Sequence, residues 1–385
     1  MSKKIVFVSE INAMSPDTTS THILTENIIF GFKKAGFNVT FIAICGSDEA
    51  YRNTGIYYKD KVDCLYTVRS RFGRSDNKYK KLLYMLGGVI FPQKYRNAVP
   101  DGVNTDGAVI VSHTPSYEAI FICRELLKRN RALKYIQYWS DPIALSGIMP
   151  EQFGFKRKPF YLLEKYAFGL ADEIVFGTET LLEMNAVLYP KYKFKMRFVD
   201  IAYLHGENSA ISLKNNMFIY AGNYYGAIRN IKPLYEAFAE SGNEFFLDIY
   251  GGGDTELEER DNIKINGRVS PEKLAEAEKT YRNTIVLLNH SCLQIPGKTF
   301  YRTNTDQIIL VIADGAHKDE LKKYLSKYNR FVICDNEKED IKNALRRIAN
   351  TEAYACPNEI IETLSPEYVS AEIIGGRDSI ENSAD

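Results

Sequence analysis

The sequence has no surplus of charge of either sign and no cysteine pattern of a metal site. Its 385 residues include 49 Lys and Arg against 49 Asp and Glu, so the formal net charge is zero. A general nucleic-acid binder carries a basic surplus, and this class is therefore excluded. The six cysteines form no CxxC pair and no Cys/His pair at metal-ligand spacing. Scattered cysteines are typical of free thiols in a reducing compartment rather than of a disulfide framework.

Long hydrophobic runs are also missing. No stretch reaches the roughly 18 apolar residues that a membrane-spanning helix needs. The apolar run near the N-terminus, residues 5–8, is too short for the core of a secretion signal. There is no internal repeat and no low-complexity segment. We therefore expect a cytoplasmic globular protein, and a length of 385 residues favours two domains.

What the chain does contain is an alternation of short β-branched runs with amphipathic stretches, which predicts parallel sheets covered by helices. In the first half, strands are expected at 4–10, 38–45, 108–113, 134–140, 172–178 and 194–200, and helices near 22–35, 116–129 and 161–169. Residues 205–216 are polar and aperiodic, and we interpret them as a linker. In the second half, strands are expected at 217–223, 245–253, 262–269, 284–290 and 308–315, and helices at 231–240 and 271–278. Two doubly wound domains are the simplest architecture.

Several runs of this sequence resemble the retaining glycosyltransferases of family 4. In the second half these are residues 220–239, 247–254, 263–275 and 286–313, and the first half agrees more loosely at 112–121, 138–142 and 163–181. Together they cover most of the chain in the family's order. The resemblance implies the α/β GT-B fold, with two Rossmann-like domains facing each other across a cleft. Residues 1–205 would bind the acceptor and 206–364 the nucleotide-sugar, and we expect 365–385 to pack back on the first domain.

The resemblance also implies an activity. The expected reaction transfers a sugar from a nucleotide-sugar donor to a glycan or lipid-linked acceptor, with retention, in the synthesis of a capsular or cell-surface polysaccharide. This would make the protein an enzyme of the hexosyltransferase type. The donor sugar, its base, the acceptor, the linkage and the oligomeric state are not specified by the sequence.

The candidate donor site follows from the charge of a nucleoside diphosphate, which needs backbone N–H groups and cations. Gly222 and Asn223 end an expected strand, and Arg229 precedes an expected helix; by resemblance this turn faces the donor phosphates. A tight turn at Gly222 and a solvated cation at Arg229 are the plainer alternative. Arg268 lies in a segment that resembles the one meeting the nucleobase, although its side chain could equally be exposed.

The run 294–298 is the strongest candidate. Gln294 and Lys298 flank a Pro-Gly pair, and Pro296 is expected to begin a helix whose N-terminus adds partial positive charge. The alternative is a loop–helix junction with an exposed lysine. At the two positions where many family members carry glutamates, this chain has Leu293 and Tyr301. The Tyr301 hydroxyl could bond a ribose, and Arg302 is expected to add a phosphate contact.

Two residues of the first half are candidates for the reacting centre. His113 closes a strand, and by resemblance it would contact the donor sugar; a structural histidine is the alternative. Asp141 follows another strand and could orient the acceptor hydroxyl, or simply form an Asp-Pro turn. His22 begins the first helix and is expected near the same cleft. There is no DxD and no carboxylate cluster near the proposed phosphate site, so we expect neither a metal nor another cofactor.

Residues 69–96 are locally basic. Eight cations accompany a single acid, Asp76, around the apolar stretch 82–91. This composition suits an anionic membrane surface, where a lipid-linked acceptor would lie, and it would place the enzyme at the inner face of the membrane. A solvated loop leading into a core helix is the alternative.

Two other functions remain as alternatives. An epimerase or dehydrogenase is disfavoured because no GxGxxG opens the first strand–helix turn. A non-catalytic partner that keeps the fold and stabilises a sister transferase is favoured by the two missing glutamates. Turnover of the donor by the purified chain would separate an enzyme from such a partner.

Overall fold

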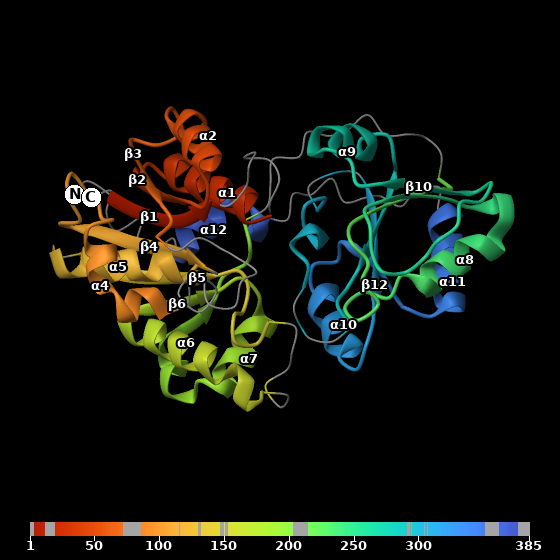
Figure 1. The fold of residues 1–385 in the computed structure, drawn as a ribbon. Helices are drawn as coiled ribbons and strands as arrows, with labels where there is room; N and C mark the ends of the chain where they lie inside the picture. Colours follow the sequence, from red (N-terminus) through yellow and green to blue (C-terminus); the bar gives the residue numbers. More distant parts are fainter. Residues whose placement is uncertain are drawn as a thin grey trace. The chain divides into compact units, whose positions relative to one another are not determined.

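The structure is a computed structural model that describes residues 4–11, 20–71, 86–114, 116–129, 132–146, 150, 153–202, 215–290, 293, 295–303, 305, 307–350 and 362–375. The described chain forms two compact units (Figure 1). The first contains the residues up to 202 and returns at residue 363, and the second lies between them. Each unit is built on one parallel sheet.

The sheet of the first unit has seven parallel strands in the order β3-β2-β1-β4-β5-β6-β7. The strands are β1 (Lys4–Ile11), β2 (Asn38–Cys45), β3 (Cys64–Arg69), β4 (Ala108–Thr114), β5 (Lys134–Trp139), β6 (Glu173–Phe176) and β7 (Met196–Phe198). The helices are α1 (Ser20–Lys34), α2 (Asp48–Tyr58), α4 (Pro92–Arg96), α5 (Tyr117–Arg129), α6 (Lys158–Leu170), α7 (Glu179–Leu188) and α12 (Pro366–Ile373). Short 3-10 helices occur at η3 (Phe155–Arg157), η4 (Pro190–Lys195) and η7 (Glu362–Leu364). Helices lie on both faces of the sheet (Figure 1).

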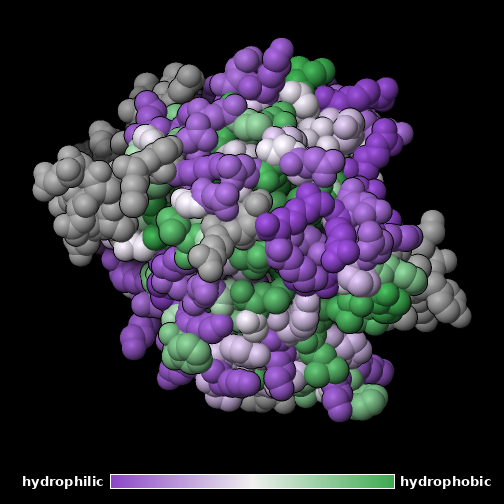
Figure 2. All heavy atoms as spheres, turned by 90° about the vertical axis from the view of Figure 1, so that its left-hand side faces the viewer, coloured by the Kyte–Doolittle hydropathy of each residue, from purple (hydrophilic) through white to green (hydrophobic). Residues whose placement is uncertain are grey.

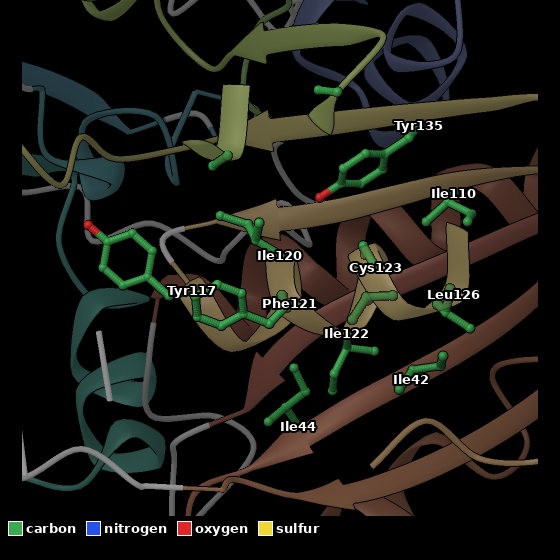
Figure 3. Packing of buried hydrophobic residues seen from close by; sticks show 14 of the residues in the cluster. Ile42, Ile44, Ile110, Tyr117, Ile120, Phe121, Ile122, Cys123, Leu126 and Tyr135 are labelled. Carbon is green, nitrogen blue, oxygen red and sulfur yellow. The ribbon is translucent and has the colours of Figure 1, made fainter. Parts of the chain in front are cut away.

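Alternate residues of β1 point to opposite faces, as the pleat of a strand requires. Val6 and Val8 belong to a buried cluster with α5. Phe7 points the other way and meets Phe32 of α1 edge to face, with ring centres 6.1 Å apart. Figure 3 shows how the apolar residues of α5 pack beside isoleucines of β2 and β4. The two faces are therefore both buried, which explains the nearly continuous apolar strands.

Helix α12 packs on α1 of the first unit. Ser370 donates a hydrogen bond of 3.0 Å from its hydroxyl to the Ile28 carbonyl. The backbones approach so closely that a Cβ added at Gly31 would lie 2.0 Å from the Pro366 carbonyl oxygen. Glycine at this position therefore permits the helices to meet.

The sheet of the second unit has six parallel strands in the order β10-β9-β8-β11-β12-β13. The strands are β8 (Met217–Ala221), β9 (Phe246–Tyr250), β10 (Ile263–Gly267), β11 (Asn283–Leu287), β12 (Ile308–Ala313) and β13 (Phe331–Asp335). The helices are α8 (Lys232–Ser241), α9 (Pro271–Glu278), α10 (Lys318–Ser326) and α11 (Lys338–Ala349), with 3-10 turns at η5 (Gly242–Glu244) and η6 (Gly297–Thr299). Helices α8 and α11 lie together on the same side of the sheet (Figure 1).

The expectation of two doubly wound parallel-sheet domains is confirmed. Two local features mark helix ends: Gly36 follows α1 with φ of +78°, and the Ser270 side chain accepts from the Lys273 amide at the start of α9. The expectation for Pro296 is wrong. Pro296 does not begin a regular helix, because it is extended (ψ 130°) and only the three-residue turn η6 follows. The helix-dipole contribution expected there is therefore absent.

Candidate functional site

In the second unit, the strand order reverses between β8 and β11, which is where ligands bind in open parallel sheets. Arg229 follows β8 and Asn289 follows β11. Nε of Arg229 donates a hydrogen bond of 3.0 Å to Oδ1 of Asn289, so one cation is fixed across the reversal point. The Asn289 side chain is buried, and Arg229 is half-buried.

A second cation lies beside the first. The half-buried Lys298, from η6, donates from Nζ to the Ala221 carbonyl at 2.6 Å. Its ammonium also lies over the Tyr220 ring, 4.7 Å from the ring centre. Burial, and then the neighbouring charge of Arg229, lower the pKa of Lys298 to about 7. The two cations are thus close enough to repel each other, and an anion placed near them would relieve that repulsion.

Tyr220 and Gly222 pack against Lys298. The Tyr220 hydroxyl donates to the Asn223 carbonyl at 3.0 Å. Burial raises the pKa of Tyr220, and the charge of Arg229 opposes that rise. A Cβ added at Gly222 would lie 1.9 Å from Nζ of Lys298. Glycine there leaves the space that the lysine occupies.

Glycines also follow the neighbouring strand β9, and they pack against the backbone of the chain after β8. A Cβ at Gly251, whose φ is +144°, would lie 2.0 Å from the Gly222 carbonyl oxygen. A Cβ at Gly253 would lie 1.6 Å from the carbonyl oxygen of Tyr224. Asn223 is exposed at this end of the sheet. These contacts bring the ends of β8 and β9 into close backbone approach, which side chains would block.

The remaining donor candidates are placed as follows. The exposed Arg268 donates from Nη2 to the Tyr225 hydroxyl at 3.2 Å. Tyr301 is half-buried just after η6. Arg302, expected to contact phosphate, instead forms an ion pair with Glu278 of α9. Gln294 lies outside the described residues.

Of the two positions at which glutamates were expected from the resemblance, Leu293 is buried with 8% exposure. Tyr301 keeps an accessible part, and its amide donates to the Lys298 carbonyl at 3.3 Å. A buried leucine cannot bond a ribose hydroxyl, whereas a tyrosine hydroxyl can donate or accept. Tyr301 is therefore the one of the two positions with a polar group to offer.

In the first unit, His113 is the last residue but one of β4 and is 1% exposed. Its Nδ1 lies 3.1 Å from the Thr25 hydroxyl, and its Nε2 lies 3.1 Å from the Ser140 hydroxyl. The ring stacks on Phe7, with ring centres 6.5 Å apart. Burial lowers the pKa of His113 to about 3, so the imidazole is neutral at physiological pH. A direct contact with a sugar would require Ser140 to move aside.

Ser140 lies between His113 and Asp141, the two candidates for the reacting centre. Its hydroxyl lies 3.4 Å from Oδ2 of the half-buried Asp141. The other histidine considered, His22, is buried, and its Nδ1 lies 3.3 Å from the Tyr58 hydroxyl. His113, Ser140 and Asp141 therefore form a hydrogen-bonded row at the ends of β4 and β5.

The loop after Asp141 is held by a buried carboxylate that sequence reasoning missed. Oε1 of Glu164, on α6, accepts from the amides of Ile143 and Ala144 at 3.0 and 2.9 Å. The Tyr189 hydroxyl donates to the other carboxylate oxygen. Burial raises the pKa of Glu164 to about 7. In the sequence, Glu164 sits in an apolar helical stretch, and only the unusual charge there could have drawn attention to it.

Of the basic segment 69–96, the structure describes residues 69–71 and 86–96, so its central part lies outside the described residues. No helix among the described residues is long and apolar enough to cross a membrane. Within the same residues, no group of three or more His, Cys, Asp or Glu side chains is arranged to hold a metal ion. The described cysteines, Cys45, Cys64, Cys123 and Cys334, are free thiols.

No family model matches the chain, and no curated protein matches it in sequence. Solved structures do match its fold. The N-terminal domain of a trehalose-6-phosphate phosphatase from Candida albicans aligns with a TM-score of 0.63 at 10% identity, over 100% of this chain and 98% of that one. A TarM mutant from S. aureus, solved with UDP, fondaparinux and α-GlcNAc-glycerol, gives 0.61 at 10% identity over 99% and 100%. HepE from Anabaena, solved with UDP and glucose, gives 0.53 at 10% identity over 99% of both chains. The likeness establishes the GT-B fold: two Rossmann-like domains.

Proposed function

We propose that this chain is a glycosyltransferase that moves a sugar from a nucleotide-sugar donor to a glycan or lipid-linked acceptor. The observation that carries the proposal is the convergence of Arg229 and Lys298 at the end of β8. Two cations above a glycine-lined strand end suit a diphosphate leaving group, whose developing charge they would stabilise. TarM and HepE, which share the fold, were both solved with UDP.

We assign the donor to the second unit, with Gly222 and Asn223 contributing backbone, Arg229 and Lys298 binding phosphates, and Arg268 and Tyr301 serving the nucleoside. Gln294, which lies outside the described residues, is proposed to serve the donor with Lys298. His113 and Asp141 of the first unit serve the acceptor and the reacting sugar, with His113 acting as a neutral hydrogen-bonding group. Retention, as in family 4, and a role in cell-surface polysaccharide synthesis at the cytoplasmic face of the membrane are part of the proposal. So are metal-independent chemistry and peripheral contact of residues 69–96 with an anionic membrane.

The test begins with ligand binding. A thermal-shift screen of the full chain against UDP-, GDP-, CMP- and dTDP-sugars should show one nucleotide class raising Tm, because a ligand that binds only the native state stabilises it. Lys298→Met should remove that rise, whereas Lys232→Met, at an exposed ion pair on α8, should keep it. A screen in which no activated sugar raises Tm would refute donor binding.

Turnover is measured next, as release of the nucleoside diphosphate from the donor that binds. The anomeric configuration of the product, read by NMR, should equal that of the donor, and the rate should be unchanged in EDTA. An epimerase would alter the sugar without releasing it from the nucleotide, and this result would replace the proposal.

The second candidate is a non-catalytic partner of a sister transferase. The buried Leu293 and the pairing of Arg302 with Glu278 favour it, because neither residue is then available to a donor. This candidate predicts no release of diphosphate under any acceptor, together with co-purification of another transferase. Release by the isolated chain would eliminate it.

A further inference from the structure

An apolar groove of about 590 Å³ lies in the first unit between residues 86–90, which are helical, and α6. Its apolar lining includes Val89, Phe155, Leu162 and Tyr166, and the exposed Lys156 and Lys158 also line it. The volume falls within the roughly 300–1,000 Å³ of small-molecule sites. The sequence does not predict this groove, because α6 is remote in sequence from the basic segment 69–96.

The two walls of the groove are fixed to one another by a buried arginine. Nη1 of Arg124, on α5, donates to the Gly88 carbonyl at 2.8 Å and to the Tyr166 hydroxyl at 3.2 Å. Gly88 itself packs so tightly on the Phe121 ring that an added Cβ would lie 2.0 Å from it. The groove is therefore preformed rather than created when a ligand arrives.

The apolar side chains around this groove are unusually exposed. Phe155 is 85% exposed, and Val89, Ile90 and Leu162 are between 51% and 53% exposed. Figure 2 views the molecule from the side of this unit and shows hydrophobic patches interrupting a hydrophilic surface. Exposed apolar side chains grouped around one hollow mark an interaction site.

In the two described segments that contribute to the groove, the exposed charges have one sign. Residues 86–97 and 153–166 carry six cations and one acid, Glu164, which is buried. The cations are Lys94, Arg96, Lys156, Arg157, Lys158 and Lys165. Three of them lie over aromatic rings: Lys94 over Phe91 at 5.6 Å, Lys158 over Phe155 at 5.7 Å and Lys165 over Tyr161 at 5.9 Å. An apolar hollow edged by cations is complementary to a hydrocarbon chain attached to an anionic head group.

We propose that this groove takes one hydrocarbon chain of an anionic membrane lipid, with Lys156 and Lys158 at its phosphate. The proposal rests in part on the proposed function, since it specifies how the enzyme would meet a membrane-held acceptor. In this proposal, α6 and residues 86–91 together form the membrane-binding surface. The surface binds an individual lipid molecule and is not merely attracted to the membrane by its charge. An acidic peptide would pair with the lysines but would leave the apolar lining of the groove uncovered.

Insertion is tested with a tryptophan placed at the groove. The native Trp139 is 1% exposed and supplies a constant background. Phe155→Trp should give a blue-shifted emission with vesicles containing phosphatidylglycerol, and lipids brominated in the acyl chain should quench it. The matched control is Phe194→Trp on η4, which is 82% exposed and lies beneath Lys195 but lines no part of the groove. Equal responses of both variants, or none in Phe155→Trp, would overturn the proposal.

Affinity is tested by co-sedimentation with phosphatidylcholine vesicles, with and without phosphatidylglycerol. Each cation near an anionic surface strengthens binding about fivefold. The double variant Lys156→Gln/Lys158→Gln should therefore bind about 25-fold more weakly, and Leu162→Ser should weaken binding further, whereas Phe194→Ser should not. Binding of an acidic peptide but not of vesicles would assign the groove to a protein partner instead.

The nucleotide-sugar thermal shift, run on the same variants, separates the two proposals. It should be unchanged in Phe155→Trp and Leu162→Ser. A chain that binds a nucleotide-sugar but ignores vesicles would refute only the lipid site. A Phe155→Trp variant whose indole enters vesicles but which binds no nucleotide-sugar would refute only the proposed function.

Discussion

Arg229 and Asn289 are joined by a hydrogen bond of 3.0 Å from Nε to Oδ1. The bond connects the chain after β8 with the chain after β11, the two strands at which the sheet order reverses. Asparagine accepts the bond without cancelling the charge of the guanidinium. Arg229 therefore keeps a full positive charge in a fixed direction, beside Lys298.

This pairing predicts different effects of two substitutions at one position. Asn289→Ala leaves the charge of Arg229 but frees its side chain, and donor affinity should fall about tenfold, the value of one typical hydrogen bond. Asn289→Asp would pair with Arg229 and cancel its charge, and it should weaken the donor more, by about 100-fold, while leaving Tm of the free protein equal or higher. Calorimetric titration and thermal melts of both variants are the measurements. A tighter donor complex in Asn289→Asp would show that Arg229 does not face an anion.

Lys298 predicts a pH dependence of stability and of binding. Its pKa is lowered from 10.5 to about 7 in the folded protein, so the unfolded chain binds more protons between these values. The free energy of unfolding should therefore rise with pH in that window. A bound diphosphate favours the charged lysine, so donor binding should take up a proton above pH 7. The Kd should then increase by up to about tenfold per pH unit.

The matched variant for this effect is Lys298→Arg, whose charge is fixed. Calorimetry in buffers of different ionisation enthalpy should detect proton uptake in the wild type at pH 8 and none in the variant. Equal pH slopes in both proteins would remove Lys298 from the phosphate site.

Glu164 predicts a second pH effect with the opposite sign. Burial raises its pKa from 4.5 to about 7, so the folded protein binds more protons than the unfolded chain between these values. Its contribution to stability should be full below pH 4.5 and should be lost as pH rises through 7. Glu164→Gln stays neutral and can still accept from Ile143 and Ala144. Relative to wild type, the variant should therefore gain up to about 3 kcal/mol in free energy of unfolding as pH rises across this range.

Urea unfolding at several pH values measures that difference. The exposed Glu183→Gln on α7 controls for the loss of one carboxylate. If Glu164→Gln were less stable than wild type by the same amount at every pH, the carboxylate would be ionised throughout, and the assignment would be wrong.

The packing of α12 on α1 predicts contrasting effects of two glycine substitutions. In Gly31→Ala, the new methyl would meet the Pro366 carbonyl oxygen and the Ser370 hydroxyl at 2.0 and 2.2 Å. Overpacking of this kind costs about 1–3 kcal/mol, and Tm should fall. Gly55 of α2 has open space around its Cβ position, so Gly55→Ala should stabilise the helix by about 0.5–1 kcal/mol. Thermal unfolding of both variants is the check, and an unchanged Tm in Gly31→Ala would mean that α12 does not hold this position.

Much of the fold could be predicted because parallel strands that are buried on both faces consist of continuous apolar residues. β1, β4 and β12 are of this kind. The edge strand β3 was not predicted, since most of its residues are half-buried and show no alternation. β7 was expected to span seven residues but has three, because η4 takes up the chain before it.

The candidate site, like the fold, was predictable from the sequence only in part. The sequence by itself determined which residue types lie at or after which strands: the glycines after β8 and β9, the cations at 229 and 298, and the histidine near the end of β4. Only the tertiary structure decided their partners. Asn289 is 60 residues from Arg229, and Thr25 is 88 residues from His113. Local sequence encodes backbone preference and burial, whereas a hydrogen bond, a lowered lysine pKa or an apolar groove between α6 and residues 86–90 arises when remote segments come together.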